Sequence, residues 1–211
     1  MLVYCDMDQI QKLAGLFAEF PGIGSRQSKR FVYFLHKQNK SYIKELVRLI
    51  ESLEGSVLEC ERCHRFFMKK HPTAGERCSI CTDSGRDRTI LMVVEKDSDL
   101  EAIERSSTYQ GTYFVLGGIL PMLEKNPTAK IRVNELSTLI GVEFSELKEV
   151  IIACAVTPES EHTADYVRTE ITKLCEQNYI KITELGRGLS TGTELEYSDA
   201  ETLRSALEGR K

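Results

Sequence analysis

Two close pairs of cysteines constrain this chain more than any other feature of its sequence. Cys60 and Cys63 form the first pair, Cys78 and Cys81 form the second, and fourteen residues separate the pairs. This spacing lets both sulfurs of a pair point at one centre, and two pairs supply the four thiolates of a tetrahedral zinc site. Because protein fills all four ligand positions, we predict one structural Zn²⁺ per chain, without a catalytic role.

Other interpretations of the cysteine pairs are open at this point. Two disulfides or four unrelated buried thiols would use the same residues, and four cysteines can also hold an iron–sulfur cluster. Nothing else in the sequence indicates an oxidising compartment, because it shows no signal peptide and no apolar run long enough to span a membrane. We therefore expect a cytoplasmic protein with reduced thiols and no membrane partner.

Charge is distributed unevenly along the chain, although the net charge is only −4. Residues 1–50 carry eight lysines and arginines against four acids, and residues 89–211 carry thirteen against twenty-one. The front is therefore net positive and the back net negative. This asymmetry indicates two kinds of partner, a polyanion for the front and a protein or a cation for the back.

A basic helical hairpin is expected at the front of the chain. Apolar residues recur at three- and four-residue steps over residues 7–20, and the sequence Pro-Gly-Ile-Gly follows at 21–24. A second helix is expected over 26–38, with Ser25 as its N-cap, and a third over 41–54. A helix, this turn and a basic helix together form the pattern of a helix–hairpin–helix motif.

Such a motif can hold a phosphate group. Gly22 and Gly24 permit backbone conformations closed to other residues, so the turn can present amide N–H groups at the start of the second helix. Arg26, Lys29 and Arg30 add positive charge, which favours binding to a phosphate backbone through counterion release. We predict sequence-independent DNA binding through these five residues. The alternative is an ordinary helical hairpin whose charges are solvated.

The chain after the cysteines alternates apolar strands with amphipathic helices, which predicts a mostly parallel α/β sheet covered by helices. A loop with several glycines and a short helix over 199–208 follow this region. Strands are expected over residues 89–94, 112–116, 148–155 and 179–183, and helices over 97–106, 131–140 and 160–177.

Three carboxylates are expected at the C-terminal ends of these strands, where parallel sheets gather their ligand-binding groups. They are Glu95, Glu159 and Glu161. The arrangement resembles Toprim domains, which place Mg²⁺ and a general acid or base there, although catalytic members carry Asp-x-Asp at the later position. We expect an acidic surface for a protein partner, with at most a weak Mg²⁺ site. The alternative is a Mg²⁺-dependent nuclease or primase-like phosphoryl transferase.

Taken together, these residues resemble the RecR family of bacterial recombination proteins over nearly the whole chain. The chain departs from the family pattern in a shorter loop at 119–130 and at Glu-Ser-Glu 159–161, where the family has Glu-Gly-Glu, followed by a new His162. The resemblance is carried by residues 21–30, the four cysteines, and the segments 83–87, 93–95, 102–104, 109–118, 187–197 and 206–210.

The resemblance implies a non-enzymatic mediator of recombinational DNA repair. Proteins of this kind form homo-oligomeric rings, often tetramers, that encircle or clamp DNA. They act with RecO and RecF to load the recombinase at single-stranded gaps. In this chain the resemblance implies four domains: a helix–hairpin–helix domain at 1–54, a four-cysteine zinc finger at 55–84, a Toprim domain at 85–178, and an oligomerisation segment at 179–211.

Overall fold

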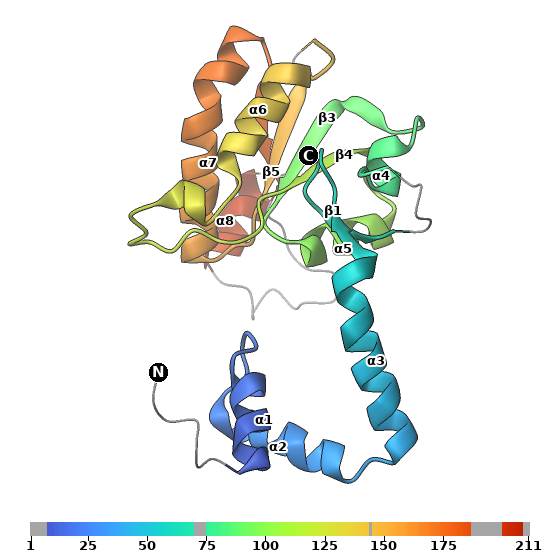
Figure 1. Ribbon diagram of the computed structural model, residues 1–211. Coiled ribbons are helices and arrows are strands. Elements are labelled where there is room, and N and C mark those ends of the chain that lie inside the picture. Colours follow the sequence, from blue (N-terminus) through green and yellow to red (C-terminus); the bar gives the residue numbers. More distant parts are fainter. Residues whose placement is uncertain (1–7, 70–74, 144, 187–199, 209–211) are drawn as a thin grey trace. The chain divides into compact units, whose positions relative to one another are not determined.

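The computed structural model describes residues 8–69, 75–143, 145–186 and 200–208 of the 211-residue chain. The chain divides into two compact units, Met1–Val57 and Leu58–Lys211, and each is treated by itself (Figure 1). The finer division into four domains stays a prediction. In the described part of the chain, no helix combines the length and the apolar character needed to cross a bilayer.

The first unit consists of three helices, as predicted. They are α1 (Gln9–Ala18), α2 (Ser25–His36) and α3 (Lys40–Ser56). Asp8 caps α1 and Asn39 caps α3, each through its side-chain oxygen. Helices α1 and α2 pack together, with the ring of Phe17 edge-on to that of Phe31 at 5.8 Å between centroids.

The turn between α1 and α2 corrects the prediction for its cap and for one of its glycines. Gly24, and not Ser25, is the N-cap of α2, because the Gly24 carbonyl accepts the first helical hydrogen bond from Ser28 at 3.0 Å. Gly24 has φ −84°, an extended conformation that any residue can adopt. Only Gly22, at φ +76°, is in the left-handed region that favours glycine.

The first unit has almost no interior of its own. Among its residues with described burial, only Ala14, Ser28 and Val32 are buried. Large apolar side chains are instead exposed on all three helices: Ile10, Leu16, Phe20, Tyr33, Phe34, Tyr42, Val47, Leu49, Ile50 and Leu53. Exposed apolar surface on this scale is typical of an interaction site.

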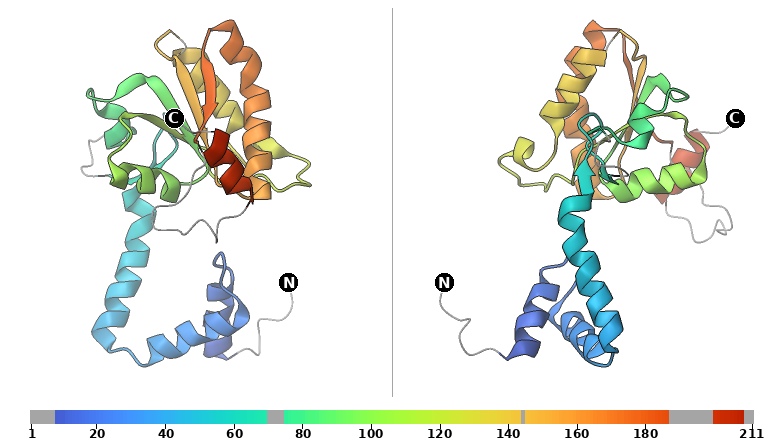
Figure 2. Two further views of the ribbon diagram at one scale, coloured as in Figure 1. Left: turned by 180° about the vertical axis from the view of Figure 1, so that it is seen from behind. Right: turned by 45° about the vertical axis from the view of Figure 1, so that its right-hand side comes forward.

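The second unit contains the predicted parallel sheet. Its strands run in the order β4-β3-β5-β6 and every neighbouring pair is parallel (Figure 2). The strands are β3 (Asp87–Val94), β4 (Gly111–Val115), β5 (Glu149–Ala153) and β6 (Lys181–Glu184). The helices are α5 (Asp97–Ser106), α6 (Val133–Glu143), α7 (Pro158–Gln177) and α8 (Ala200–Glu208).

Side chains alternate between the two faces of the sheet, so each face has its own core. Leu91 and Val93 of β3 pack with residues of α6 and α7 on one face. Met92 and Val94 pack on the other face with Leu100 of α5 and with the cysteine cluster. The cysteine region is therefore part of the core that supports the sheet, although it lies earlier in the sequence.

The cysteine region has short elements that the sequence did not reveal. A two-stranded sheet pairs β1 (Val57–Glu59) with β2 (Phe66–Met68) around the first cysteine pair. One helical turn, α4 (Ser79–Thr82), carries the second pair. Outside the cysteine region, a short 3-10 turn, η1 (Pro127–Ala129), precedes α6. Strands of three residues are too short to give a recognisable period in the sequence.

Several predicted boundaries shift by a few residues. Helix α7 begins at Pro158, because Thr157 caps it by accepting the N–H of Ser160 at 3.2 Å. Strand β6 begins at Lys181 rather than at residue 179, because Tyr179 has a left-handed φ of 58° and belongs to the preceding turn. The glycine-rich loop expected after β6 lies outside the described residues from position 187 to 199.

Candidate functional site

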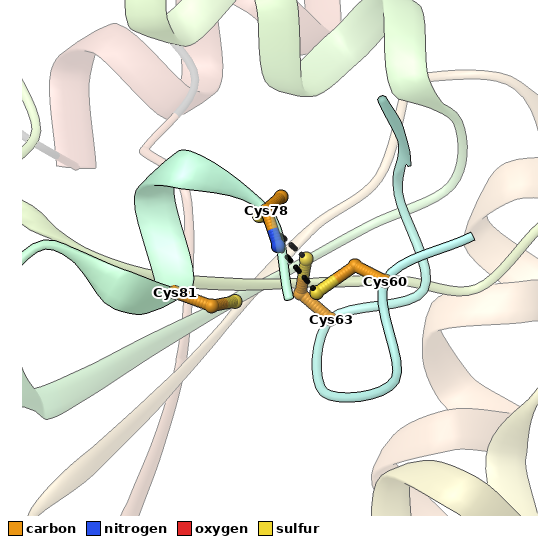
Figure 3. A group of neighbouring side chains, drawn as sticks. All are labelled: Cys60, Cys63, Cys78 and Cys81. Atoms are coloured by element: carbon orange, nitrogen blue, oxygen red, sulfur yellow. Dashed lines mark hydrogen bonds between the residues drawn. The ribbon is translucent and has the colours of Figure 1, made fainter. Parts of the chain in front are cut away.

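Four cysteine sulfurs come together at one point (Figure 3). They belong to Cys60 and Cys63, in a turn called the first knuckle, and to Cys78 and Cys81, at the start of α4, called the second knuckle. All four sulfurs lie within 4.8 Å of one another, and all four residues are buried. The sulfurs of Cys63 and Cys78 are 3.6 Å apart. Four thiolates in tetrahedral contact with zinc stand about 3.8 Å apart, so this arrangement fits a Zn²⁺ ion.

Backbone hydrogen bonds shape the first knuckle. The Cys60 N–H donates to the Arg65 carbonyl and the His64 N–H donates to the Cys60 carbonyl, both at 2.9 Å. His64 turns the chain in the left-handed region, at φ 59°. The His64 ring contacts the Glu59 carboxylate through Nδ1 at 2.7 Å and packs edge-on against Phe114, which fixes the turn on the sheet.

The second knuckle approaches the first through a direct contact with a sulfur. The Cys78 N–H donates to Sγ of Cys60 at 3.3 Å, and Cys78 is also the N-cap of α4. The Val115 N–H of β4 donates to the Cys63 carbonyl at 2.8 Å. Both knuckles are thus held in place by backbone groups, as a ligand set for a structural metal requires.

The thiols perturb one another because they are crowded together. The hydrogen bond from Cys63 lowers the pKa of the Cys60 thiol, and the same interaction raises the pKa of Cys63. The contact with Cys60 alone would raise the pKa of Cys78, but those with Cys63 and Cys81 lower it to about 6. Four ionised sulfurs at this spacing need a cation between them, which is the role that zinc fills in such sites.

The described cysteines form no disulfide. All six of them carry free thiols, including Cys175, which is buried within α7, and Cys154, which is partly buried. Cys5 lies outside the described residues. The two-disulfide alternative for the four clustered cysteines is therefore wrong.

One charged residue beside the cysteine cluster could not be found from the sequence. Arg62 is buried between the two ligands of the first knuckle and reaches Sγ of Cys81, the hydroxyl of Thr112 and the carboxylate of Glu143. No motif marks Arg62, and Glu143 follows it by 81 positions in the chain. Only the folded structure brings them together.

The predicted DNA-binding residues lie at the start of α2 and on its exposed surface. Gly22 and Gly24 form the turn, and Arg26, Lys29 and Arg30 are exposed. Gly24 supplies no side-chain oxygen to cap α2, so the first amide donors of this twelve-residue helix have no side-chain cap. The ion pair recorded in the described part of this unit joins Arg48 to Glu45 and leaves the α2 charges unneutralised.

The structure does not gather the three predicted carboxylates into one tight group. Glu95 follows β3 and is buried, with one carboxylate oxygen that has no hydrogen-bond partner. Glu159 and Glu161 lie in the first turn of α7. Within the described residues, only the four cysteines bring three or more potential ligands within 4.8 Å of one another. Glu95, Glu159 and Glu161 do not form such a group, and a weak Mg²⁺ site at these residues stays a prediction.

Three of the segments that carried the family resemblance meet in space. Arg86 forms a forked ion pair with Glu104, with Nη1 to Oε1 at 2.8 Å, and the Tyr113 hydroxyl donates to the same oxygen at 2.8 Å. The hydrogen bonds from Arg86 lower the pKa of the Glu104 carboxyl. This pair lines a cavity of about 430 Å³ between α4 and α5.

Comparison with known proteins identifies the family of the chain. A family model for the Toprim domain matches residues 90–185, and a model described as "RecR, C-terminal" matches residues 188–211. The recombination protein RecR of Pediococcus pentosaceus is 36% identical over 205 residues, covering 96% of both chains. The RecR of Prochlorococcus marinus MED4 is 33% identical over 201 residues, covering 95% of this chain and 94% of the relative.

The chain belongs to the RecR family. The RecR of Ligilactobacillus salivarius gives the same result, with 34% identity over 97% of each chain. The resemblance predicted from the motifs is thereby confirmed, and the Toprim match spans the parallel sheet described above. In this member of the RecR family, the cysteine cluster precedes the Toprim domain and supports one of its faces.

Proposed function

We propose that this RecR family protein is a non-enzymatic, zinc-stapled mediator that clamps DNA during recombinational repair. The observation that carries the proposal is the similarity to proteins named recombination protein RecR along 95% of the chain. In the cytoplasm it would act with partners of the RecO and RecF type to load a recombinase at single-stranded gaps. Its contact with DNA would be independent of sequence.

The start of α2 supplies the proposed DNA contact. Its amide donors without a side-chain cap and the positive end of the helix dipole favour a phosphate group. Arg26, Lys29 and Arg30 extend the positive surface along the same helix. Contacts of this type position a phosphate backbone and read no bases, which suits a protein that must act at any gap.

Assembly into a ring supplies the proposed clamp. The exposed apolar side chains of α1, α2 and α3 are more than a monomeric helical unit normally leaves in water. Contact with another copy of the chain would bury them. A homo-oligomer, with a tetramer as the expected size, would place several α2 surfaces around one DNA segment.

Zinc acts as a staple in this proposal. Cys60, Cys63, Cys78 and Cys81 would hold one ion. The ion would supply folding energy to a region whose described residues form two three-residue strands and a single helical turn. Glu159 and Glu161, in the first turn of α7, would face a protein partner, whereas Glu95 is buried and would not reach one.

The alternative of a Mg²⁺-dependent nuclease or primase-like enzyme is not favoured. The relatives are named for recombination, and the three carboxylates do not form one tight group. Incubating the protein with labelled DNA, nucleotides and Mg²⁺ or Mn²⁺ tests this alternative. DNA cleavage or synthesis that disappears in Glu95→Gln would overturn the non-enzymatic proposal.

The DNA contact is tested by measuring affinity against salt concentration. Each phosphate contact contributes about 0.7 to 0.9 to the slope of log affinity against log salt, so Arg26→Ala/Arg30→Ala should reduce the slope by about 2 and weaken binding. Lys40→Ala/Lys44→Ala removes the same charge from exposed positions of α3 and is the matched control. An unchanged affinity and slope in the α2 variant would reject the contact.

A further inference from the structure

Arg62 connects three parts of the second unit. It lies between the two ligands of the first knuckle and is 7% exposed. Its Nη1 donates to Sγ of Cys81 at 3.7 Å, and its Nη2 donates to the Thr112 hydroxyl of β4 at 3.3 Å. Its Nε and Nη2 form a forked pair with Glu143 at 2.7 and 2.5 Å. One guanidinium therefore contacts a metal ligand, a sheet strand and a helix.

Charge explains why a buried arginine is stable at this point. Four thiolates around Zn²⁺ leave a net charge of about −2 in a buried place, and a neighbouring cation offsets part of it. Glu143 is the last residue of α6, where the helix dipole is negative, and the last turn of α6 has no basic residue of its own. The positive charge of Arg62 offsets both the charge of the thiolates and the negative end of α6 at Glu143. In return, Cys81 and Glu143 each accept hydrogen bonds from the guanidinium group of Arg62.

We infer that Arg62 is a positioning residue that holds the zinc-bound Cys81 thiolate and transmits the state of the metal centre to the C-terminal end of α6. The inference rests on the proposed zinc site. With the metal bound, Cys81 is a thiolate and accepts from Arg62. With the metal removed, the Cys81 side chain is no longer held in place, so its contact with Arg62, the pair between Arg62 and Glu143, and the end of α6 loosen.

Two consequences separate this role from simple packing. Hydrogen bonds to ligand atoms tune a metal site, and loss of such a partner commonly weakens metal binding about 10- to 100-fold. The N–H···S bond also changes the electronic character of the thiolate. Removal of Arg62 should therefore speed zinc release and shift the thiolate-to-metal absorption band of the cobalt-substituted protein, whereas a lost packing contact would not move that band.

The experiment first measures the zinc content of the full-length wild-type protein, which separates a failure of the zinc proposal from a failure of this inference. The rate of zinc release to a chromophoric chelator is then compared among Arg62→Met, Arg62→Lys and Glu143→Gln. We expect release to be about 10-fold faster or more in Arg62→Met, intermediate in Arg62→Lys, and changed less in Glu143→Gln, where the contact to Cys81 remains.

Arg77→Met is the matched control. Arg77 stands directly before Cys78 as Arg62 stands before Cys63, but it is exposed, and within the described part of the chain it donates no recorded hydrogen bond to a sulfur. The Arg77→Met variant should release zinc at the wild-type rate. If Arg62→Met releases zinc no faster than Arg77→Met, or its cobalt absorption band is unchanged, the inference is wrong.

Hydrogen exchange tests the transmission to α6 without requiring Arg62→Met to fold. Chelation of the wild type should increase amide exchange over residues 139–143, because the pair between Arg62 and Glu143 loosens. In Glu143→Gln, exchange there should already be faster with zinc bound, and chelation should add little. An equal response to chelation in both proteins would show that the metal does not act on α6 through this pair.

Discussion

The two units of this chain solve the problem of burying apolar surface in opposite ways. The second unit encloses its apolar residues on both faces of a four-stranded sheet, with the cysteine cluster as part of one core. The first unit buries three residues among those described and exposes large apolar side chains on every helix. A helical unit that buries so little, such as this first unit, gains most of its stability from contacts outside itself.

This difference indicates a division of labour. The sheet unit can hold its fold alone if the proposed zinc completes the cysteine region, since the core and the proposed metal both act within the chain. The helical unit presents apolar surface and positive charge to the outside, and these suit another subunit and DNA. Substitutions in the sheet unit should therefore unfold it, whereas substitutions in the helical unit should weaken its binding to partners.

The largest effect is expected from removing a zinc ligand. Cys60→Ser should lose the metal and with it folding energy, because structural zinc sites in small peptides contribute about 10 to 16 kcal/mol of apparent binding energy. Hydrogen exchange should rise over residues 58–69 and 75–83, while exchange in α1 and α2 stays unchanged. Metal analysis together with exchange mass spectrometry measures both.

Cys175→Ser is the control for that experiment. Cys175 is buried in α7 and belongs to the core but not to the cluster, so this variant should lose stability and keep one zinc per chain. Folded wild-type protein that contains no zinc would contradict the structural role of the metal. So would a Cys60→Ser variant in which hydrogen exchange at the two knuckles is as slow as in the wild type.

The next largest effect is expected at the exposed apolar surface of α3. Ile50→Lys/Leu53→Lys should dissociate the proposed oligomer, because burying each such side chain contributes about 1.5 to 3 kcal/mol. Native mass spectrometry at micromolar concentration measures the change. Glu51→Lys adds positive charge to the same helix without removing apolar surface, and should leave the mass unchanged. An unaltered assembly in the double variant would mean that this surface serves another purpose.

The smallest effects separate the two glycines of the turn. Gly22→Ala forces an L-residue to φ +76° and should destabilise the turn by about 1 kcal/mol, seen as faster exchange at the start of α2. Gly24→Ser is sterically allowed, since nothing lies within 4 Å of the added Cβ, and its hydroxyl should cap α2 and stabilise it by about 0.5 kcal/mol.

Gly24→Ser also tests the DNA contact. A serine hydroxyl at the N-cap accepts one of the amide donors that the proposal reserves for phosphate, so DNA affinity should fall while the stability of α2 rises. Fluorescence anisotropy with labelled DNA, beside exchange measurements, gives both quantities. If affinity rises together with helix stability, the amide donors are not the phosphate site.

Much of the architecture could be predicted from the sequence because the signals are local. The strand at 89–94 is nearly all apolar, as a strand buried on both faces requires, and β3 occupies this place in the middle of the sheet. The spacing of the cysteines alone predicted that they cluster as a set of metal ligands, and the structure brings the sulfurs of Cys60, Cys63, Cys78 and Cys81 together.

The features that the sequence did not reveal depend on contacts between distant residues. Arg62 meets Glu143 only because β4 and α6 are folded beside the knuckle. Ser25 is a better intrinsic N-cap than glycine, but the turn conformation that starts at Gly22 makes Gly24 the last extended residue. Glu95 follows β3, and Glu159 and Glu161 lie in the first turn of α7, but strand order alone does not tell whether three carboxylates form one tight group.

Retention on DNA of different topology tests the central claim most directly. The protein is bound to a gapped circular plasmid and to the same plasmid cut once, and both are then challenged with high salt, which weakens phosphate contacts. A clamp that encircles DNA should remain on the circle and slide off the ends of the linear form. Equal loss from both molecules, at the rate set by salt alone, would contradict the account.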